Sequence, residues 1–215
     1  MSKTVLVFIE HIDGQVSRSS YEAVRAAQLI SQELGFEASA VICGSGVSGI
    51  AAEVATRKLA AVYTAEDPAL ANYTADGYAQ ALRQVVNQLN PELVLMAHTY
   101  EVRDYAPKLA ANLGRALLGD CIGYKLEGGE LIFTRQIFQG KLACDVVPAT
   151  AAPNFASFQI GEDGRGVHGD HISGHGISWQ DLGSGQFAWR LEEEGELTGY
   201  IAASDARKDG HAAGF

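Results

Sequence analysis

The chain has 215 residues, with 16 Lys and Arg against 26 Asp and Glu, and its formal net charge is −10. This length fits one domain, or one domain with a large appendage, and is enough to bury a sizeable core. With 47% apolar and 20% charged residues, the composition excludes a wholly disordered chain. The acidic balance argues against a nucleic-acid partner or an anionic membrane surface, because both require a basic face.

The three cysteines, Cys43, Cys121 and Cys144, are scattered and include no Cys-x-x-Cys pair. This pattern predicts neither a disulfide framework nor a zinc ribbon, and we expect small buried side chains. The apolar run at residues 5–9 is too short for a signal-peptide core or a membrane span, and no other run approaches about 18 residues. We therefore expect a cytoplasmic protein without membrane insertion.

Residues 1–114 alternate strand-like and helix-like segments. The expected strands are the apolar runs at residues 4–9, 38–43, 59–64 and 93–97. The expected helices follow them: one capped by Ser19 and ended by Gly35, one over residues 47–58, one between Thr74 and Asn90, and one ended by Gly114. This order predicts an α/β fold, with a parallel sheet covered by helices on both faces.

The helical period is lost over residues 116–160. Strand-like runs at residues 131–138, 142–147 and 155–160 are preceded by turn signals such as Gly128-Gly129. The simplest interpretation is an antiparallel strand extension of the sheet after residue 115.

Residues 161–215 differ again in composition. They hold 12 of the 24 glycines and four of the six histidines, and four basic against ten acidic side chains leave a net charge of −6. Residues 187–191 and 197–201 flank an acidic turn like a hairpin. The predicted domains are thus residues 1–160, an α/β domain, and residues 161–215, an acidic arm rich in Gly and His. Trp179 and Trp189 in this arm are typical of a docking surface.

A glycine-rich loop with Gly-x-Gly-x-x-Gly spacing follows the second expected strand, and Glu66 lies about twenty residues further on. This arrangement is close to a dinucleotide fingerprint, in which the glycines let a pyrophosphate approach a helix N-terminus. The fingerprint normally follows the first strand, so we favour a plain βα loop and keep a nucleotide site as the alternative. The candidate nucleotide-site residues share the C-terminal edge of the sheet and are Glu10, His11, Gly44, Gly46 and Gly49.

Three histidines, His168, His171 and His175, have spacing that could converge on a metal ion. The surrounding glycines and the lack of a nearby cysteine favour a polar linker, so we expect no metal site. No serine lies in a nucleophile motif with plausible partners, and we expect no catalytic residues.

Five blocks of sequence resemble the N-terminal domain of the electron transfer flavoprotein alpha subunit. These are VLVFIEH at residues 5–11, DPAL at 67–70, RDYAPKLA at 103–110, LGD at 118–120 and FTRQIFQGK at 133–141. The resemblance covers roughly residues 3–160.

The resemblance implies an adenine-nucleotide-hydrolase-like α/β domain that serves as scaffold and interface. It also implies electron transfer from flavin dehydrogenases toward the respiratory chain through FAD, and pairing with an electron transfer flavoprotein beta subunit. The family-matching polar residues expected at domain contacts or in internal ion pairs are Arg103, Asp104, Asp120, Arg135 and Lys141.

The resemblance places FAD mainly in a domain that would follow residue 160, opening with a Gly/Arg-rich flavin loop. Residues 161–215 contain no such loop. We therefore expect FAD to be held by a separate FAD-domain protein or not at all. Two other functions stay open: a stand-alone adenine-nucleotide or dinucleotide-binding module, and a homo-oligomeric interaction protein.

Overall fold

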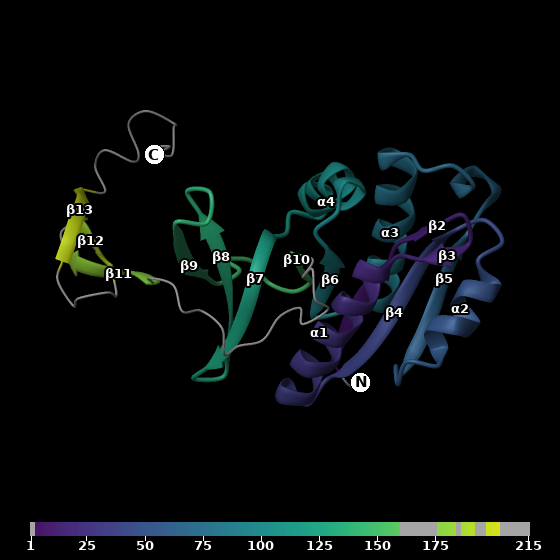
Figure 1. Ribbon diagram of the computed structural model, residues 1–215, viewed down its shortest axis with the longest axis horizontal. Coiled ribbons are helices and arrows are strands. Elements are labelled where there is room, and N and C mark those ends of the chain that lie inside the picture. The colour runs from purple at the N-terminus through teal and green to yellow at the C-terminus, as the bar shows by residue number, and fades with distance from the viewer. Residues whose placement is uncertain (1–2, 160–175, 184–185, 192–196, 203–215) are drawn as a thin grey trace. The chain divides into compact units, whose positions relative to one another are not determined.

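The computed structural model describes residues 3–159, 176–183, 186–191 and 197–202 (Figure 1). The chain divides into two compact units: Met1–Ile122 with Pro148–His168, and Gly123–Val147 with Gly169–Phe215. One strand, β7 (Leu117–Glu127), contributes its first residues to unit 1 and its last to unit 2. The expected boundary after residue 160 stays a prediction.

Unit 1 is built on a parallel sheet with the strand order β7-β10-β6-β1-β4-β5. Its strands besides β7 are β1 (Thr4–Ile9), β4 (Glu37–Gly44), β5 (Ala61–Glu66), β6 (Leu93–Ala97) and β10 (Asn154–Phe158). The pairings of β1 with β4 and β6, of β4 with β5, and of β10 with β6 and β7 are all parallel. The predicted parallel sheet is confirmed.

The assignment of residues 155–160 to an antiparallel extension is wrong, because β10 lies between β6 and β7 and runs parallel to both. A parallel pairing needs a long crossover connection, and the segment between β6 and β10 supplies it. The apolar run alone carried no information about the direction of the strand.

Helices lie on both faces of this sheet (Figure 1): α1 (Arg18–Leu34), α2 (Ser48–Ala55), α3 (Ala75–Leu89) and α4 (Tyr100–Leu113). The N-cap residue of α1 is Ser17 rather than Ser19, and it makes no side-chain cap hydrogen bond; the two serine hydroxyls bond each other at 2.7 Å. The short elements of unit 1 are β2 (His11–Ile12), β3 (Gln15–Val16) and the 3₁₀ turn η1 (Pro68–Leu70). No helix among the described residues is long and apolar enough to cross a membrane.

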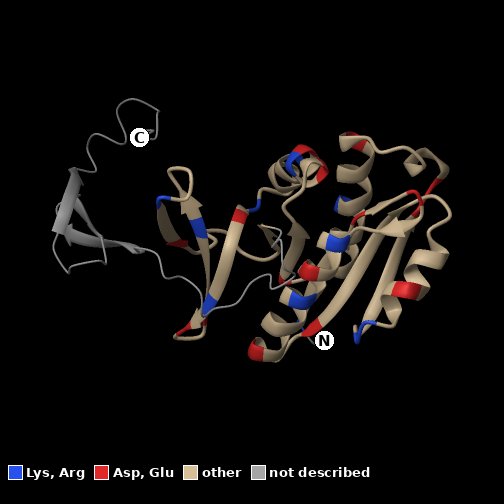
Figure 2. Cartoon of the chain, viewed as in Figure 1, with Lys and Arg blue, Asp and Glu red and all other residues tan. Residues whose placement is uncertain are grey.

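Strand alternation supplies two apolar faces. Leu6 and Phe8 belong to the same buried cluster as the α3 and α4 residues Tyr78 and Tyr105, and the Phe8 and Tyr105 ring centroids are 5.4 Å apart. On the other face α1 packs against β1, and its residue Ile30 is fully buried. Strands β1 and β6 carry no charged residue (Figure 2), as expected for a sheet covered on both sides.

Unit 2 contains an antiparallel hairpin of β8 (Glu130–Ile137) and β9 (Leu142–Val146). The hairpin turns through three successive left-handed residues, Phe138, Gln139 and Gly140, with φ of 51°, 58° and 81°. The antiparallel direction expected for this segment is confirmed.

The backbone of unit 2 also forms β11 (Gly176–Gly183), β12 (Gln186–Leu191) and β13 (Leu197–Ala202). The antiparallel pair β12–β13 confirms the expected hairpin, and β11 adds a strand that was not predicted. Trp179 on β11 is in register with Trp189 on β12.

Candidate functional site

The C-terminal edge of the unit 1 sheet contains a topological switch point. Strands β1 and β6 are neighbours, but β1 leads through α1 to β4 on one side, whereas β6 leads through α4 toward β7 and β10 on the other. Open α/β sheets bind ligands in the crevice outside the carboxyl ends of such strands. Both the glycine-rich loop and the residues after β1 and β6 lie along this edge.

The glycine-rich loop already holds an anion from the protein itself. Glu66, at the end of β5, accepts hydrogen bonds through Oε1 from the Gly46 amide at 2.6 Å and the Val47 amide at 3.3 Å. These amides precede α2, where a pyrophosphate would otherwise be bound. The acid whose spacing contributed to the dinucleotide-like pattern therefore occupies the place of the phosphate.

Gly44 is required by the packing of this loop. A Cβ atom there would lie 2.5 Å from Val47 Cγ1 and 2.9 Å from His11 Nε2. His11 Nε2 in turn hydrogen-bonds the Cys43 carbonyl oxygen at 2.9 Å. The space above Gly44 is thus filled by the protein's own side chains, and these residues do not fit a dinucleotide. The geometry favours the plain βα loop.

Glu10 is the most unusual ionisable residue at this edge. It is only 7% exposed, although its backbone is well bonded: the Glu10 amide donates to Ser20 Oγ at 2.8 Å, and Ser20 Oγ donates to the Glu10 carbonyl at 3.2 Å. Burial raises the pKa of the Glu10 carboxyl, which is only partly offset by a hydrogen bond with the Thr99 side chain. Its Oε2 has no hydrogen-bond partner among the described residues.

Beneath Glu10 lies an aromatic cluster that stabilises the fold. The rings of Phe8, Tyr73, Tyr78 and Tyr105 meet edge to face or tilted, with centroid distances of 5.1–6.3 Å. Burial raises the pKa of Tyr78 to about 12 and that of Cys43 to about 12. These groups are neutral at physiological pH, as expected of core side chains.

The contact candidates of unit 1 have partners within their own unit. Asp104 accepts a hydrogen bond from the Tyr73 hydroxyl at 2.9 Å, and the Arg103 guanidinium lies 5.7 Å from the centroid of the Tyr100 ring. Asp120 is 3.5 Å from His98 Nε2. The three candidates Arg103, Asp104 and Asp120 contact different partners and do not form one cluster.

The candidates of unit 2 lie on the β8–β9 hairpin. Arg135 is in register with Cys144 on the neighbouring strand, and its Nε is buried without a hydrogen-bond partner among the described residues. Lys141 lies at the turn, where it lines a cavity of about 570 Å³ with Phe138, Gln139 and Leu142. Phe138 is 45% exposed, which makes the turn an apolar and cationic surface.

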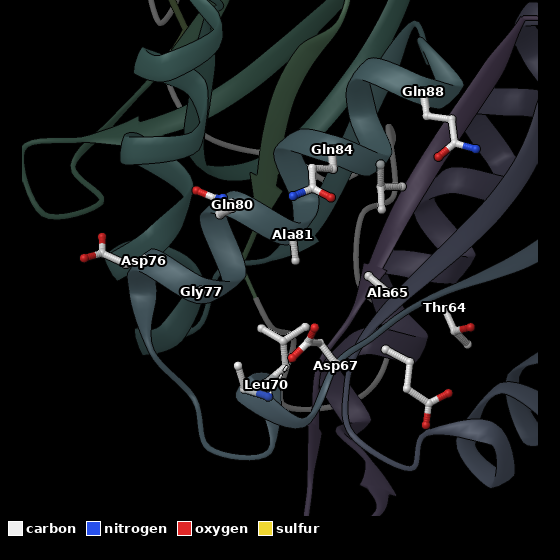
Figure 3. Close-up of a pocket in the computed structure, with 13 residues that line it drawn as sticks. Thr64, Ala65, Asp67, Leu70, Asp76, Gly77, Gln80, Ala81, Gln84 and Gln88 are labelled. Atoms are coloured by element: carbon white, nitrogen blue, oxygen red, sulfur yellow. Dashed lines mark hydrogen bonds between the residues drawn. The ribbon is translucent and has the colours of Figure 1, made fainter.

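A cavity of about 630 Å³ between β5 and α3 was missed by the sequence reasoning (Figure 3). One wall carries Gln80, Gln84 and Gln88, spaced four residues apart on α3. At one end the Asp67 carboxylate accepts a hydrogen bond from the Ala69 amide at 2.8 Å. The four-residue glutamine spacing was the only signal for this wall, and it is also typical of a solvated helix face.

The candidate metal ligands His168, His171 and His175 lie outside the described residues. Within the part of the chain that the structure describes, no group of three or more His, Cys, Asp or Glu side chains is arranged to hold a metal ion.

Comparison with known proteins gives a consistent match over unit 1 and the hairpin. The family model for the electron transfer flavoprotein domain matches residues 5–162. The electron transfer flavoprotein subunit alpha of Bacillus subtilis is 42% identical over 141 residues, covering 66% of this chain and 43% of the relative. The same subunit is 28% identical in Thermoanaerobacterium thermosaccharolyticum, covering 82% of this chain and 54% of the relative, and 34% identical in Syntrophomonas wolfei, covering 65% and 43%.

The chain spans about half the length of the curated relatives it matches. The matched residues include all five sequence blocks from which the resemblance was drawn. Because the family model covers most of the chain, the resemblance is confirmed. The chain belongs to the electron transfer flavoprotein family and is similar to the N-terminal part of its alpha subunits.

Proposed function

We propose that this chain is an alpha-subunit-type component of an electron transfer flavoprotein, and that residues 1–160 serve as its scaffold and subunit interface. In this proposal electrons pass from flavin dehydrogenases toward the respiratory chain through FAD, which supplies the redox chemistry. The protein's contribution is to position the partners that hold the flavin. Residues 161–215 act as an acidic arm.

One observation carries the scaffold role. The loop of unit 1 that best resembles a nucleotide site is filled by Glu66, His11 and Val47. The described residues therefore supply no cradle for FAD at this loop. We place the cofactor on residues outside unit 1, either on a separate FAD-domain protein or at an interface with a beta subunit.

The β8–β9 turn is the contact surface that this proposal favours. Lys141 and Phe138 are both exposed there, and the Lys141 ammonium forms no ion pair among the described residues. An exposed aromatic ring is typical of a surface that binds a protein partner, and an unpaired cation beside it can steer an acidic partner. Arg103, Asp104, Asp120 and Arg135 remain proposed contact residues of lower accessibility or with internal partners.

The test is co-purification of the full chain with a beta-subunit-type protein, with an absorbance spectrum of each fraction. We expect the chain alone to retain no stoichiometric FAD and to form a stable complex with the beta-type protein. Equimolar FAD on the isolated chain would overturn the placement of the cofactor. Failure of the two proteins to associate, with or without FAD, would overturn the scaffold role.

A charge reversal tests the contact surface. Lys141→Glu is expected to weaken the complex at least tenfold, because it places a carboxylate where a cation faces the partner. Lys58→Glu is the matched control, since Lys58 is also exposed and belongs to unit 1. Equal affinities of the two variants would remove the β8–β9 turn from the interface.

A further inference from the structure

A third cavity lies at the C-terminal edge of the unit 1 sheet. It has a volume of about 470 Å³ and is lined by Ser17 and Ser19 at the start of α1, and by His98, Thr99, Tyr100 and Arg103 between the end of β6 and the first turn of α4. We propose that this cavity binds a phosphate group, either inorganic phosphate or the phosphate of a small monoester. The scaffold role requires no ligand here, so the proposal goes beyond it.

The position of the cavity is the one that the topology favours. Its lining comes from the segments that follow β1 and β6, the two neighbouring strands whose connections diverge. This crevice is where open α/β sheets bind ligands. The glycine-rich loop is a different part of the same edge, and its amides are already occupied by Glu66.

The lining combines one guanidinium with a pair of serine hydroxyls. Arg103 and the bonded hydroxyls of Ser17 and Ser19 face a lining that includes no aspartate or glutamate. The other two polar side chains have partners of their own, because Thr99 bonds Glu10 and the His98 imidazole bonds Ser157 and lies 3.5 Å from Asp120. Arg103 forms no ion pair with a carboxylate among the described residues, so its planar fork is available for an oxyanion. The Tyr100 ring is 87% exposed beside it and offers a flat surface to the rest of an ester.

The start of α1 has no internal anion. No acidic residue lies in its first turn, and Ser17 makes no capping hydrogen bond; its hydroxyl bonds that of Ser19. By contrast, the amides before α2 bind the Glu66 carboxylate. The positive end of the 17-residue helix α1 therefore meets the cavity with its first amides uncapped by a side chain.

A buried polar atom next to the lining is also left unsatisfied. Glu10 is 93% buried and hydrogen-bonds the Thr99 side chain, which lines the cavity, whereas its Oε2 has no partner among the described residues. Burial raises the pKa of this carboxyl and thereby favours its neutral form, which opposes an anion at the neighbouring lining less than an ionised carboxylate would.

The test uses the full chain in phosphate-free buffer. Sodium phosphate, ribose 5-phosphate and AMP are titrated by calorimetry and by amide chemical shifts, with sodium chloride at matched ionic strength as the reference. We expect saturable binding, with shifts confined to the amides of residues 17–20 and 98–103. Equal affinities identify the phosphate alone as the recognised group, and tighter binding of AMP identifies a nucleotide ester held against Tyr100.

Two variants complete the test. Arg103→Gln is expected to weaken phosphate binding at least tenfold, while Arg83→Gln on the exposed face of α3, with the same change in charge, leaves it unaltered. Ser17→Asp supplies α1 with its own anion, so it should abolish binding and preserve or raise the melting temperature. The proposal is overturned if chloride reproduces the phosphate response, or if both Arg103→Gln and Ser17→Asp bind phosphate as the native chain does.

Discussion

The Glu66 carboxylate accepts a hydrogen bond of 2.6 Å from the amide of Gly46, twenty residues earlier in the chain. This contact ties the end of β5 to the loop between β4 and α2. It gives the positive end of α2 a permanent internal anion. The loop whose glycine spacing resembles a nucleotide-binding motif is thus held in place by a contact within the protein.

Removal of this anion should destabilise unit 1. Glu66→Ala leaves the amides of Gly46 and Val47 without their acceptor, and we expect a loss of about 1 kcal/mol in the free energy of unfolding. Urea denaturation at pH 7 measures the loss. Glu37→Ala, an exposed acid at the start of β4, serves as the control and should change stability by less than about 0.5 kcal/mol. Equal losses in both variants would mean that the loop contact adds no stability.

The buried Glu10 carboxyl should make stability depend on pH. Because burial raises its pKa in the folded state, the folded chain keeps a proton that the unfolded chain releases, and stability falls as the pH rises through this interval. Glu10→Gln removes this fall. Its stability relative to the native chain should therefore be higher at pH 8 than at pH 4.

Denaturation of both proteins at the two pH values tests this expectation, with Glu37→Gln as the exposed control. The control should differ from the native chain by the same amount at both pH values. A Glu10→Gln difference that does not change with pH would show that the buried carboxyl is not the source of the dependence.

Thiol reactivity should distinguish the three cysteines. Cys43 and Cys121 are fully buried, and burial raises the pKa of Cys43 to about 12, so neither should react with a disulfide reagent in the folded chain at pH 8. Cys144 is half-buried and should react slowly, because burial also raises its pKa. Thiol counts before and after denaturation measure this, and Cys144→Ser should lower the folded count to zero. A fast second thiol would contradict the packing around β4 or β7.

Helix capping should differ between α3 and α1. The Thr74 hydroxyl accepts a hydrogen bond from the Gly77 amide at 3.2 Å, so Thr74→Ala is expected to cost about 1 kcal/mol. Ser17→Ala should cost less in phosphate-free buffer, because Ser17 makes no such bond. Chemical denaturation of the two variants compares them directly, and an equal or larger cost at Ser17 would contradict the geometry at the start of α1.

The sequence was sufficient to predict those elements whose structure depends on a few neighbouring residues. The short apolar runs at residues 4–9 and 93–97 predicted strands covered on both faces, which the structure confirms. Gly35 and Gly114 end their helices in the left-handed conformation, with φ of 68° and 62°. The sequence was not sufficient where the structure of an element depends on a partner far away in the chain. The direction of β10 depends on its pairing with β6 and β7, which lie far from it in the chain.

The site shows the same division. The sequence placed Glu66 near the glycine-rich loop, but an acid that binds a ribose and one that fills the anion position have the same spacing. Only the 2.6 Å contact separates the two interpretations. The phosphate cavity joins Ser17 to Arg103 across the edge of the sheet, and residues that far apart in the chain carry no joint signal in the sequence.

The turn of the β8–β9 hairpin keeps two side chains where glycine would be less strained. Phe138 and Gln139 both adopt left-handed backbone conformations, each at a cost of about 1–2 kcal/mol relative to glycine. The turn needs only the backbone shape, which glycine at both positions would provide more cheaply. In return, the hairpin carries an aromatic ring and a side-chain amide at its turn. Replacement of both residues by glycine would relieve the backbone strain and remove the side chains that a partner could contact.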